Sequence, residues 1–203
     1  MATATRDRIL DALEEILVRD GTDKATLDAV AAGAGVSKGG LLYHFPSKDA
    51  MMAAMVRRLA ERAERKRLQA ADAGASLAEW YLSPPATPST SRRGADVNSE
   101  PDSGPASEPD LDPDDALEIA LFRSTLAAFR STDGAPGAVQ DAVVEMMGMY
   151  DRVLQDEFDD PVHAEIVRLV GDGLYLAALV GLPGPDPDLH RRVVERLLGD
   201  QVR

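Results

Sequence analysis

The run VSKGGLLYHFPSKDA, residues 36–50, gathers polar and aromatic side chains that could contact a nucleic acid. Ser37 and Lys38 offer a hydroxyl and a cation to phosphate groups. The backbone N–H groups at the start of a helix also favour anions. Tyr43 and His44 follow a turn later, where either side chain could reach a phosphate or a base edge. These residue types at this spacing predict a surface that docks on DNA.

Two adjacent glycines, Gly39 and Gly40, stand inside the helix predicted for this run. Each should cost about 1 kcal/mol of helix stability relative to alanine. Close approach of the backbone to a ligand would explain that cost, and the ligand here would be DNA. Leu41 and Phe45 lie four positions apart and should both face the core.

Helices on both sides must hold this run in place. Residues 6–21 have apolar positions at helical spacing and end at a glycine, which predicts an amphipathic helix. Thr26 and Ser37 are typical helix N-caps, and Gly35 falls in the turn between the two helices that they begin. Ser47 caps a further, longer helix. Two short helices joined by a turn and supported by another form a helix-turn-helix, whose second helix enters the major groove of DNA.

The formal net charge of −13 argues against a nucleic-acid partner when taken alone, but the charge is unevenly distributed. Residues 1–70 hold 12 Lys and Arg against 10 Asp and Glu, whereas residues 71–203 hold 10 against 25. A locally basic segment can still bind a polyanion, because screening weakens repulsion beyond about 10 Å. The basic residues of 57–67 are expected to form the solvated face of a helix, with direct DNA contact as the alternative.

Residues 9–55 resemble the DNA-binding region of the tetracycline-repressor (TetR) family of bacterial transcription regulators. The run GVSKGGLLYHFPSKDAM is similar to that family's second helix-turn-helix helix and to the start of its linking helix. The family often has threonine at the position of Gly40 and tyrosine at the position of Leu42. The run and the resemblance together predict DNA contacts by Thr26, Ser37, Lys38, Gly39, Gly40, Leu42, Tyr43, His44 and Lys48.

The rest of the chain predicts helices and no strands. Residues 114–131, 137–158, 162–182 and 185–200 have helical spacing of apolar residues, and strand-like alternation is absent throughout. Residues 83–113 contain seven of the 13 prolines and predict a flexible insert. The fold class is therefore all-α. We expect a helix-turn-helix DNA-binding domain at residues 1–48 and a helical effector-binding and dimerisation domain at 49–203.

Aromatic and methionine side chains of the second domain could line a small-molecule pocket, although such residues at helical spacing often form ordinary core. Arg123 stands within an apolar helix and could bind an acidic effector or extend to water. Arg168 and Asp172 are four apart and are expected to pair. The candidate pocket residues are Phe122, Arg123, Leu126, Met146, Met147, Tyr150 and Tyr175.

The last two helices are expected to form a dimer interface. Gly173, Ala177 and Gly181 recur every four residues, and small side chains let helices approach closely. A helix so apolar needs more than one neighbour, and a second copy of the chain would supply it. The alternative is packing within one chain. The candidate interface residues are Ile166, Val170, Gly173, Leu174, Ala177, Leu189, Val193 and Leu197.

Several other classes of protein are disfavoured. The chain has no cysteine, and His163 has no companion histidine in its helix, so we expect no metal site and no cofactor. No catalytic motif occurs, and Asp114 with Asp115 suits the start of a helix, so an enzyme is not expected. No apolar run reaches the roughly 18 residues of a membrane span, and no apolar signal segment opens the chain. We therefore expect a cytoplasmic protein.

The resemblance implies a homodimeric repressor that binds a palindromic DNA operator. A small-molecule effector in the C-terminal helices would change the separation of the two DNA-binding domains and release the operator. Two alternatives remain at this stage. One is a helix-turn-helix regulator without a small-molecule effector, which acts as an activator or is controlled by a protein partner. The other is a helical protein-interaction module.

Overall fold

The computed structural model describes residues 2–83, 118, 120–123, 137–180 and 182–199, and these contain helices and no strand. The helices are α1 (Ala2–Asp20), α2 (Leu27–Gly33), α3 (Lys38–His44), α4 (Lys48–Asp72), α5 (Leu77–Tyr81), α7 (Ala138–Glu157), α8 (Pro161–Leu179) and α9 (Pro187–Leu198). No helix of these residues is long and apolar enough to cross a membrane. The predicted all-α fold is confirmed. The predicted insert at 83–113, except Ser83, lies outside the described residues, as do Leu126 and Gly181.

The three predicted N-caps of the N-terminal region are all present. Thr26, Ser37 and Ser47 each accept a hydrogen bond from the backbone N–H three residues later, at 3.0–3.1 Å. Gly21 and Gly35 end the preceding helices with φ angles of 78° and 64°, a conformation that side chains with a Cβ rarely adopt. Local sequence therefore sets where α2, α3 and α4 begin.

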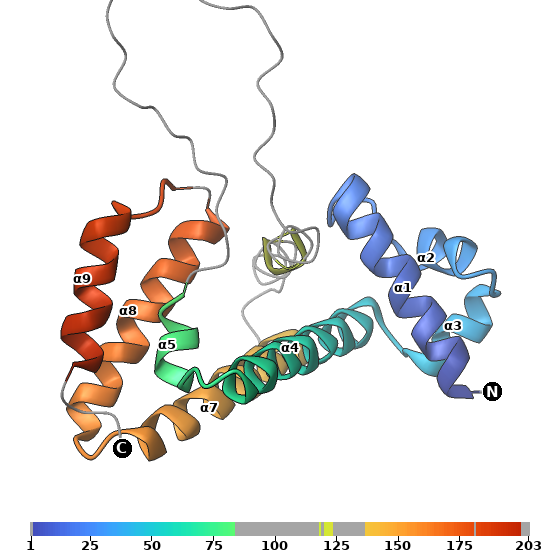
Figure 1. Ribbon diagram of the computed structural model, residues 1–203. Helices are drawn as coiled ribbons and strands as arrows, with labels where there is room; N and C mark the ends of the chain where they lie inside the picture. The colour runs from blue at the N-terminus through green and yellow to red at the C-terminus, as the bar shows by residue number, and fades with distance from the viewer. Residues whose placement is uncertain (1, 84–117, 119, 124–136, 181, 200–203) are drawn as a thin grey trace, which may run out of the picture.

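The helices α1 to α3 form one compact unit, which we call the head (residues 2–47; Figure 1). Its centre is fully buried and aliphatic: Ile9 and Leu13 of α1, Val30 of α2 and Leu41 of α3 have no exposed surface. The methionines at the start of α4 extend this core, so the head is packed directly onto the long helix that leads away from it.

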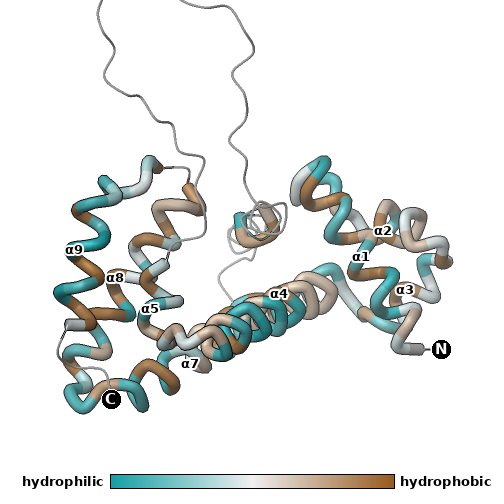
Figure 2. Tube along the Cα trace, viewed as in Figure 1, coloured by the Kyte–Doolittle hydropathy of each residue, from teal (hydrophilic) through white to brown (hydrophobic). Residues whose placement is uncertain are grey.

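The remaining helices form the body (residues 48–199 where described). The 25-residue α4 runs from the head into the body, and α7 packs along it. The short helix α5 lies together with α8 and α9 at the end of the body that is farthest from the head (Figure 1). A second buried cluster lies there, around Leu82, Leu154 and Val167. Figure 2 shows apolar residues over much of α8, whereas polar and apolar residues alternate along α4.

Polar contacts join the head to the body at the start of α4. The Lys48 ammonium donates to the Thr22 carbonyl of the head at 3.1 Å. One residue later, Asp49 accepts from the backbone N–H of Ala138 at 2.8 Å and so caps the N-terminus of α7. Gly137 provides no side-chain cap of its own. Two consecutive residues of α4 therefore contact opposite parts of the molecule.

The basic residues of α4 mostly pair with carboxylates of neighbouring helices. Arg58 and Arg62 contact acidic residues of α1 at 2.5 and 2.9 Å, and Arg57 contacts Glu145 of α7 at 3.2 Å. Lys66 contacts Glu118 at 3.3 Å. The prediction of a merely solvated face is therefore too simple, because these side chains tie α4 to the helices on either side of it.

Candidate DNA-binding surface and ligand cavity

The helix α3 presents its polar side to solvent and is anchored by a single buried side chain. Leu41 is the one residue of this helix that is buried. Tyr43 is 83% exposed and Leu42 is 37% exposed. The Tyr43 and His44 rings meet edge to face with centroids 5.2 Å apart. The end of α3 therefore offers an aromatic pair at the surface, which suits contact with a groove or a phosphate backbone.

At the start of α3 the Ser37 hydroxyl caps the helix, and the backbone at Gly39 is accessible from outside. A Cβ built at Gly40 would lie 3.3 Å from the Ser37 hydroxyl oxygen, whereas one at Gly39 would meet nothing nearer than 4.0 Å. Gly40 therefore leaves room for the capping bond, and Gly39 leaves the first turn accessible from outside. Lys38 pairs with Asp28 at 2.9 Å, but both side chains are more than half exposed. An exposed pair contributes little stability, so DNA phosphate can compete for this lysine.

Thr26 and Lys48 flank the head where a DNA backbone could lie. The Thr26 hydroxyl caps α2, as predicted. Lys48 is partly buried and bonded to the Thr22 carbonyl, which leaves two of its three donors for another acceptor. The lysine therefore has a structural role that the sequence analysis did not predict.

The body contains a cavity of about 410 Å³ between α4, α5, α7 and α8, with Glu118 and Phe122 also in its wall. Its volume lies within the range of small-molecule sites. Five predicted pocket residues line it: Phe122, Met146, Met147, Tyr150 and Tyr175. Arg123 is not among its lining residues. The guanidinium instead donates to the carbonyls of Leu179 and Ala178, at the C-terminus of α8. A helix end favours this cation there, so Arg123 fastens α8.

Several residues of the cavity wall were not predicted from the sequence. Trp80 and Tyr81 come from α5, and Lys66, Glu118 and Asp172 add charged groups. A signal for α5 was present, because Ser76 and Glu79 form a capping box. Packing of α5 on α8 depends on a glycine, which local sequence does not reveal. A Cβ at Gly171 would lie 2.2 Å from a ring carbon of Tyr81.

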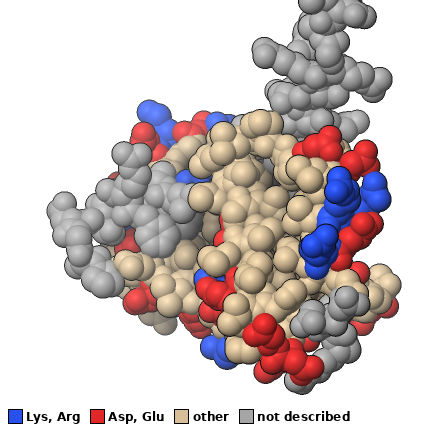
Figure 3. Space-filling view, turned by 90° about the vertical axis from the view of Figure 1, so that its left-hand side faces the viewer, with Lys and Arg blue, Asp and Glu red and all other residues tan. Residues whose placement is uncertain are grey.

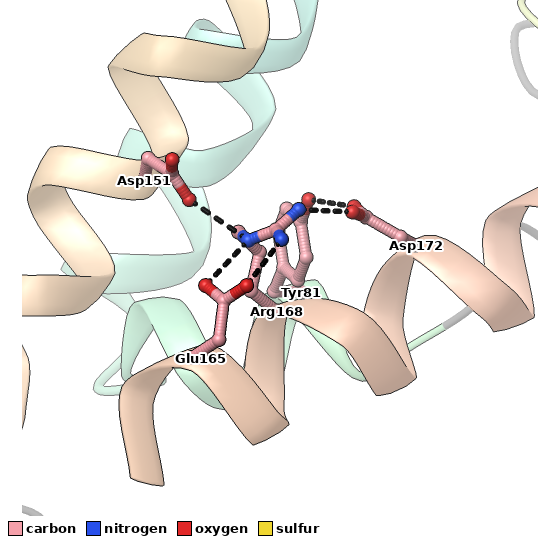
Figure 4. Close-up of polar contacts among 5 residues, drawn as sticks. All are labelled: Tyr81, Asp151, Glu165, Arg168 and Asp172. Carbon is pink, nitrogen blue, oxygen red and sulfur yellow. Dashed lines mark hydrogen bonds and ion pairs between the residues drawn. The ribbon is translucent and has the colours of Figure 1, made fainter. Parts of the chain in front are cut away.

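An ion cluster includes two residues of the cavity wall, Tyr81 and Asp172 (Figure 4). Tyr81 donates to Asp172 at 2.5 Å, and the other oxygen of Asp172 accepts from Arg168 at 2.7 Å, which confirms the predicted pair. The same guanidinium contacts Glu165 at 2.5 Å and Asp151 at 3.1 Å. The hydrogen bond to Glu165 raises the pKa of Arg168. Burial, followed by the bond to Asp172, raises the pKa of Tyr81, so its hydroxyl stays protonated at neutral pH.

Two further hydroxyls of the cavity wall lack partners. The Tyr150 and Tyr175 hydroxyl oxygens are buried and have no hydrogen bond within the described part of the chain. Burial raises the pKa of both hydroxyls, and nearby Glu118 raises it further. A buried polar group without a partner is costly, so these neutral phenols are suited to bind a polar group of a ligand.

Apolar side chains of α8 and α9 lie exposed at this end of the body, and Figure 3 shows a broad uncharged area there with charged groups around and within it. Of the candidate interface residues there, Ile166 is 44% exposed and Leu189 is 54% exposed. A Cβ at Gly173 would meet nothing within 4 Å. Val170 and Leu197 differ, because both pack partly into the body, and the Leu197 carbonyl accepts from His163 at 2.6 Å. The exposed apolar residues are Val162, Ile166, Leu169, Leu176, Val180, Leu182, Leu189 and Val193.

A helix-turn-helix head joined to a helical body with a cavity defines a class of DNA-binding regulators. Residues 9–55 match the model described as "Bacterial regulatory proteins, tetR family". Residues 114–199 match "Tetracyclin repressor-like, C-terminal domain". Both matches place the chain in the TetR family of bacterial regulatory proteins.

Curated relatives match over a short stretch. The HTH-type transcriptional regulator SrpR of Pseudomonas putida is 42% identical over 55 residues, which are 27% of this chain and 26% of that protein. The HTH-type transcriptional regulator UidR of Escherichia coli K12 is 39% identical over 62 residues, 30% of this chain and 32% of that one. The chain thus spans only about a quarter to a third of these relatives' length.

Solved structures share the whole fold. The multidrug binding protein EbrR, crystallised with ethidium, superposes with a TM-score of 0.62 at 25% identity over 95% of this chain and 98% of that one. A transcriptional regulator of Streptomyces coelicolor A3(2), SCO7518, gives a TM-score of 0.65 at 19% identity, over 95% and 97% of the two chains.

Proposed function

We propose that this regulator is a homodimeric repressor that binds a palindromic operator and is released from it by a small molecule held in the body. The cavity of about 410 Å³ carries the proposal, because its walls combine aromatic side chains with two buried tyrosine hydroxyls that have no partner among the described residues. The similarity to EbrR, solved with ethidium and with malachite green, supports a ligand at such a site.

The apolar face of α8 and α9 supports dimerisation. Large aliphatic side chains lie exposed along both helices, and a second copy of the chain would cover them. Pairing both helices with their two-fold mates would give a four-helix bundle. Two heads related by a two-fold axis require an operator with matching symmetry.

The junction at the start of α4 supports coupling between cavity and head. Met146, Met147 and Tyr150 of α7 line the cavity, and the N-terminus of the same helix is capped by Asp49. The preceding residue, Lys48, contacts the head. A ligand that shifts α7 would therefore move the first turn of α4, and this movement would change the separation of the two heads.

Selection from a random duplex library tests DNA recognition without a known operator. We expect enrichment of a palindrome, with affinity that falls steeply as salt increases. No enriched sequence would favour the protein-interaction module instead. A thermal-shift screen of small molecules would then supply ligands, each of which should lower affinity for the enriched palindrome.

Met147→Trp provides the control for the cavity, since a larger side chain from α7 would fill it. This variant should bind the palindrome but no longer respond to the ligands found. A ligand that still releases the variant acts elsewhere. If no molecule both stabilises the protein and lowers its operator affinity, the regulator has no small-molecule effector of this kind.

A further inference from the structure

We propose that the cavity of the body selects a lipophilic organic cation, such as an aromatic or quaternary ammonium compound. This inference rests on the proposed function, in which the cavity holds a ligand, and it names the charge of that ligand. Three observations carry it: the aromatic walls, the excess of carboxylates around them, and the two tyrosine hydroxyls that have no hydrogen-bond partner among the described residues.

Five aromatic rings line the cavity and meet one another in two groups. Trp80, Tyr81 and Tyr150 form one group, with ring centroids 5.7–6.5 Å apart. Phe122 and Tyr175 form the other, edge to face at 5.0 Å. The faces of such rings attract cations through their quadrupole, and indole attracts them most strongly. A delocalised or quaternary cation also loses little hydration on entry compared with a primary ammonium, so an apolar cavity of this kind can accept it.

Carboxylates outnumber cations around these rings. Glu118 and Asp172 line the cavity together with one cation, Lys66. Beyond Asp172, the single guanidinium of Arg168 is shared with Asp151 and Glu165 (Figure 4). Among the described residues, these four carboxylates in the cavity wall or in the cluster beside it accompany two cations, an excess of two negative charges. An incoming cation reduces the repulsion within this group, whereas an anion adds to it.

The unpartnered hydroxyls fit the same ligand. Burial and the nearby carboxylate of Glu118 keep the Tyr150 and Tyr175 phenols protonated, so they present neutral oxygens rather than phenolates. A phenol oxygen can direct its lone pairs at a cation without bringing a second charge into the cavity. A neutral ligand with a carbonyl group would satisfy these hydroxyls but would leave the carboxylate excess unbalanced, and this difference makes charge the property to test.

Two pairs of compounds provide the test, and the members of each pair match in shape but differ in charge. Tetraphenylphosphonium and tetraphenylborate differ in charge, and benzyltrimethylammonium and neopentylbenzene form a smaller pair of cation and neutral isostere. Calorimetric titration of the full chain should give affinities for each cation at least about tenfold higher than for its matched partner, a difference of about 1.4 kcal/mol. The fluorescence of Trp80, the chain's single tryptophan, should change on binding, which places the ion in the cavity.

The cation preference must arise at the cavity and not from the acidic chain as a whole. Asp172→Asn and Glu118→Gln, each of which keeps an acceptor oxygen, should each reduce the preference for phosphonium several-fold. The matched control is Asp188→Asn on α9, where the carboxylate is 84% exposed and is not part of the cavity wall. This variant removes the same charge and should leave the preference unchanged.

The outcomes separate this inference from the proposed function. Equal or tighter binding of the borate or of the neutral isostere overturns the inference, and so does the failure of both cations to bind. An equal loss in Asp188→Asn also overturns it, because a general field would then account for the preference. The proposed function stands in each of these cases if another molecule from the screen releases the operator, and it fails if none does.

Discussion

The head and the body distribute polar and apolar groups in opposite ways. The head buries aliphatic side chains and leaves the polar and aromatic groups of α3 at the surface. The body has tyrosines and partly buried carboxylates in the wall of a cavity and a partly buried arginine beside it, and it leaves apolar residues of α8 and α9 exposed. A head that meets DNA always meets the same phosphate backbone, whereas a body must fit a particular ligand and a second copy of itself. This contrast fits the curated relatives, which match over only 55–62 residues, about the length of the head with the start of α4.

The largest effect is expected from a charge on the exposed face of the body. Gly173→Arg should give a folded monomer, because a Cβ there meets nothing within 4 Å in the single chain, while the guanidinium would be buried in the dimer. Loss of the second head should lower operator affinity by about 10²- to 10⁴-fold. Sedimentation and operator titration measure both effects.

Val144→Arg provides the control for that experiment, since Val144 is 63% exposed on α7. It should remain dimeric and bind the operator normally. If the Gly173→Arg variant stays dimeric, the interface lies elsewhere. The contrast between the exposed apolar residues of the body and the exposed polar residues of the head would then be weaker.

A smaller effect is expected from the aromatic end of α3. Tyr43→Ala should cost about 1–3 kcal/mol of binding to the operator and less on random DNA, because a base-edge contact would be lost. Its melting temperature should hardly change, since the side chain is 83% exposed. Equal losses on both DNAs would make Tyr43 a backbone contact.

A still smaller effect is expected from a substitution at Asp49, which links the two regions. Asp49→Ala removes the cap of α7 and should cost about 1 kcal/mol of stability. The ligand should then release the operator less completely, because α7 no longer holds the first turn of α4. Asp49→Asn keeps an acceptor oxygen and should restore both properties. If asparagine behaves like alanine, charge rather than capping joins the two regions.

The smallest effect is expected from Lys48→Ala. Loss of one phosphate contact should weaken operator and random DNA about equally and reduce the salt slope by about one. The Lys48 bond to the Thr22 carbonyl adds a modest loss of stability, about 1 kcal/mol. A changed sequence preference with an unchanged slope would contradict the assignment to phosphate.

Local signals predicted the head almost completely. Capping residues act within three positions, so Thr26, Ser37 and Ser47 could be identified from sequence and are confirmed. The last two helices of the body were also predicted: α8 and α9 begin and end within three residues of the expected positions. Spacing of apolar residues is enough for helices of this length.

The cavity was only partly predictable, because its walls meet through tertiary contacts. The five-residue α5 is too short for periodicity to reveal, and with it Trp80 and Tyr81 were missed. Arg123 was assigned to the pocket, yet its partners are carbonyls about 55 residues away in the chain. Nothing near Arg123 in the sequence indicates that the last turn of α8 will lie beside it.

The way α3 is anchored also bears on how such regulators diverge. One buried leucine and one capping serine hold a seven-residue helix, and Lys38, Leu42, Tyr43 and His44 are not buried. Substitutions at exposed positions of this kind usually change stability by no more than about 0.5 kcal/mol. Mutation can therefore rewrite the sequence preference of the head without requiring compensating changes in the core, so a duplicated copy could acquire a new operator while its body keeps the same ligand.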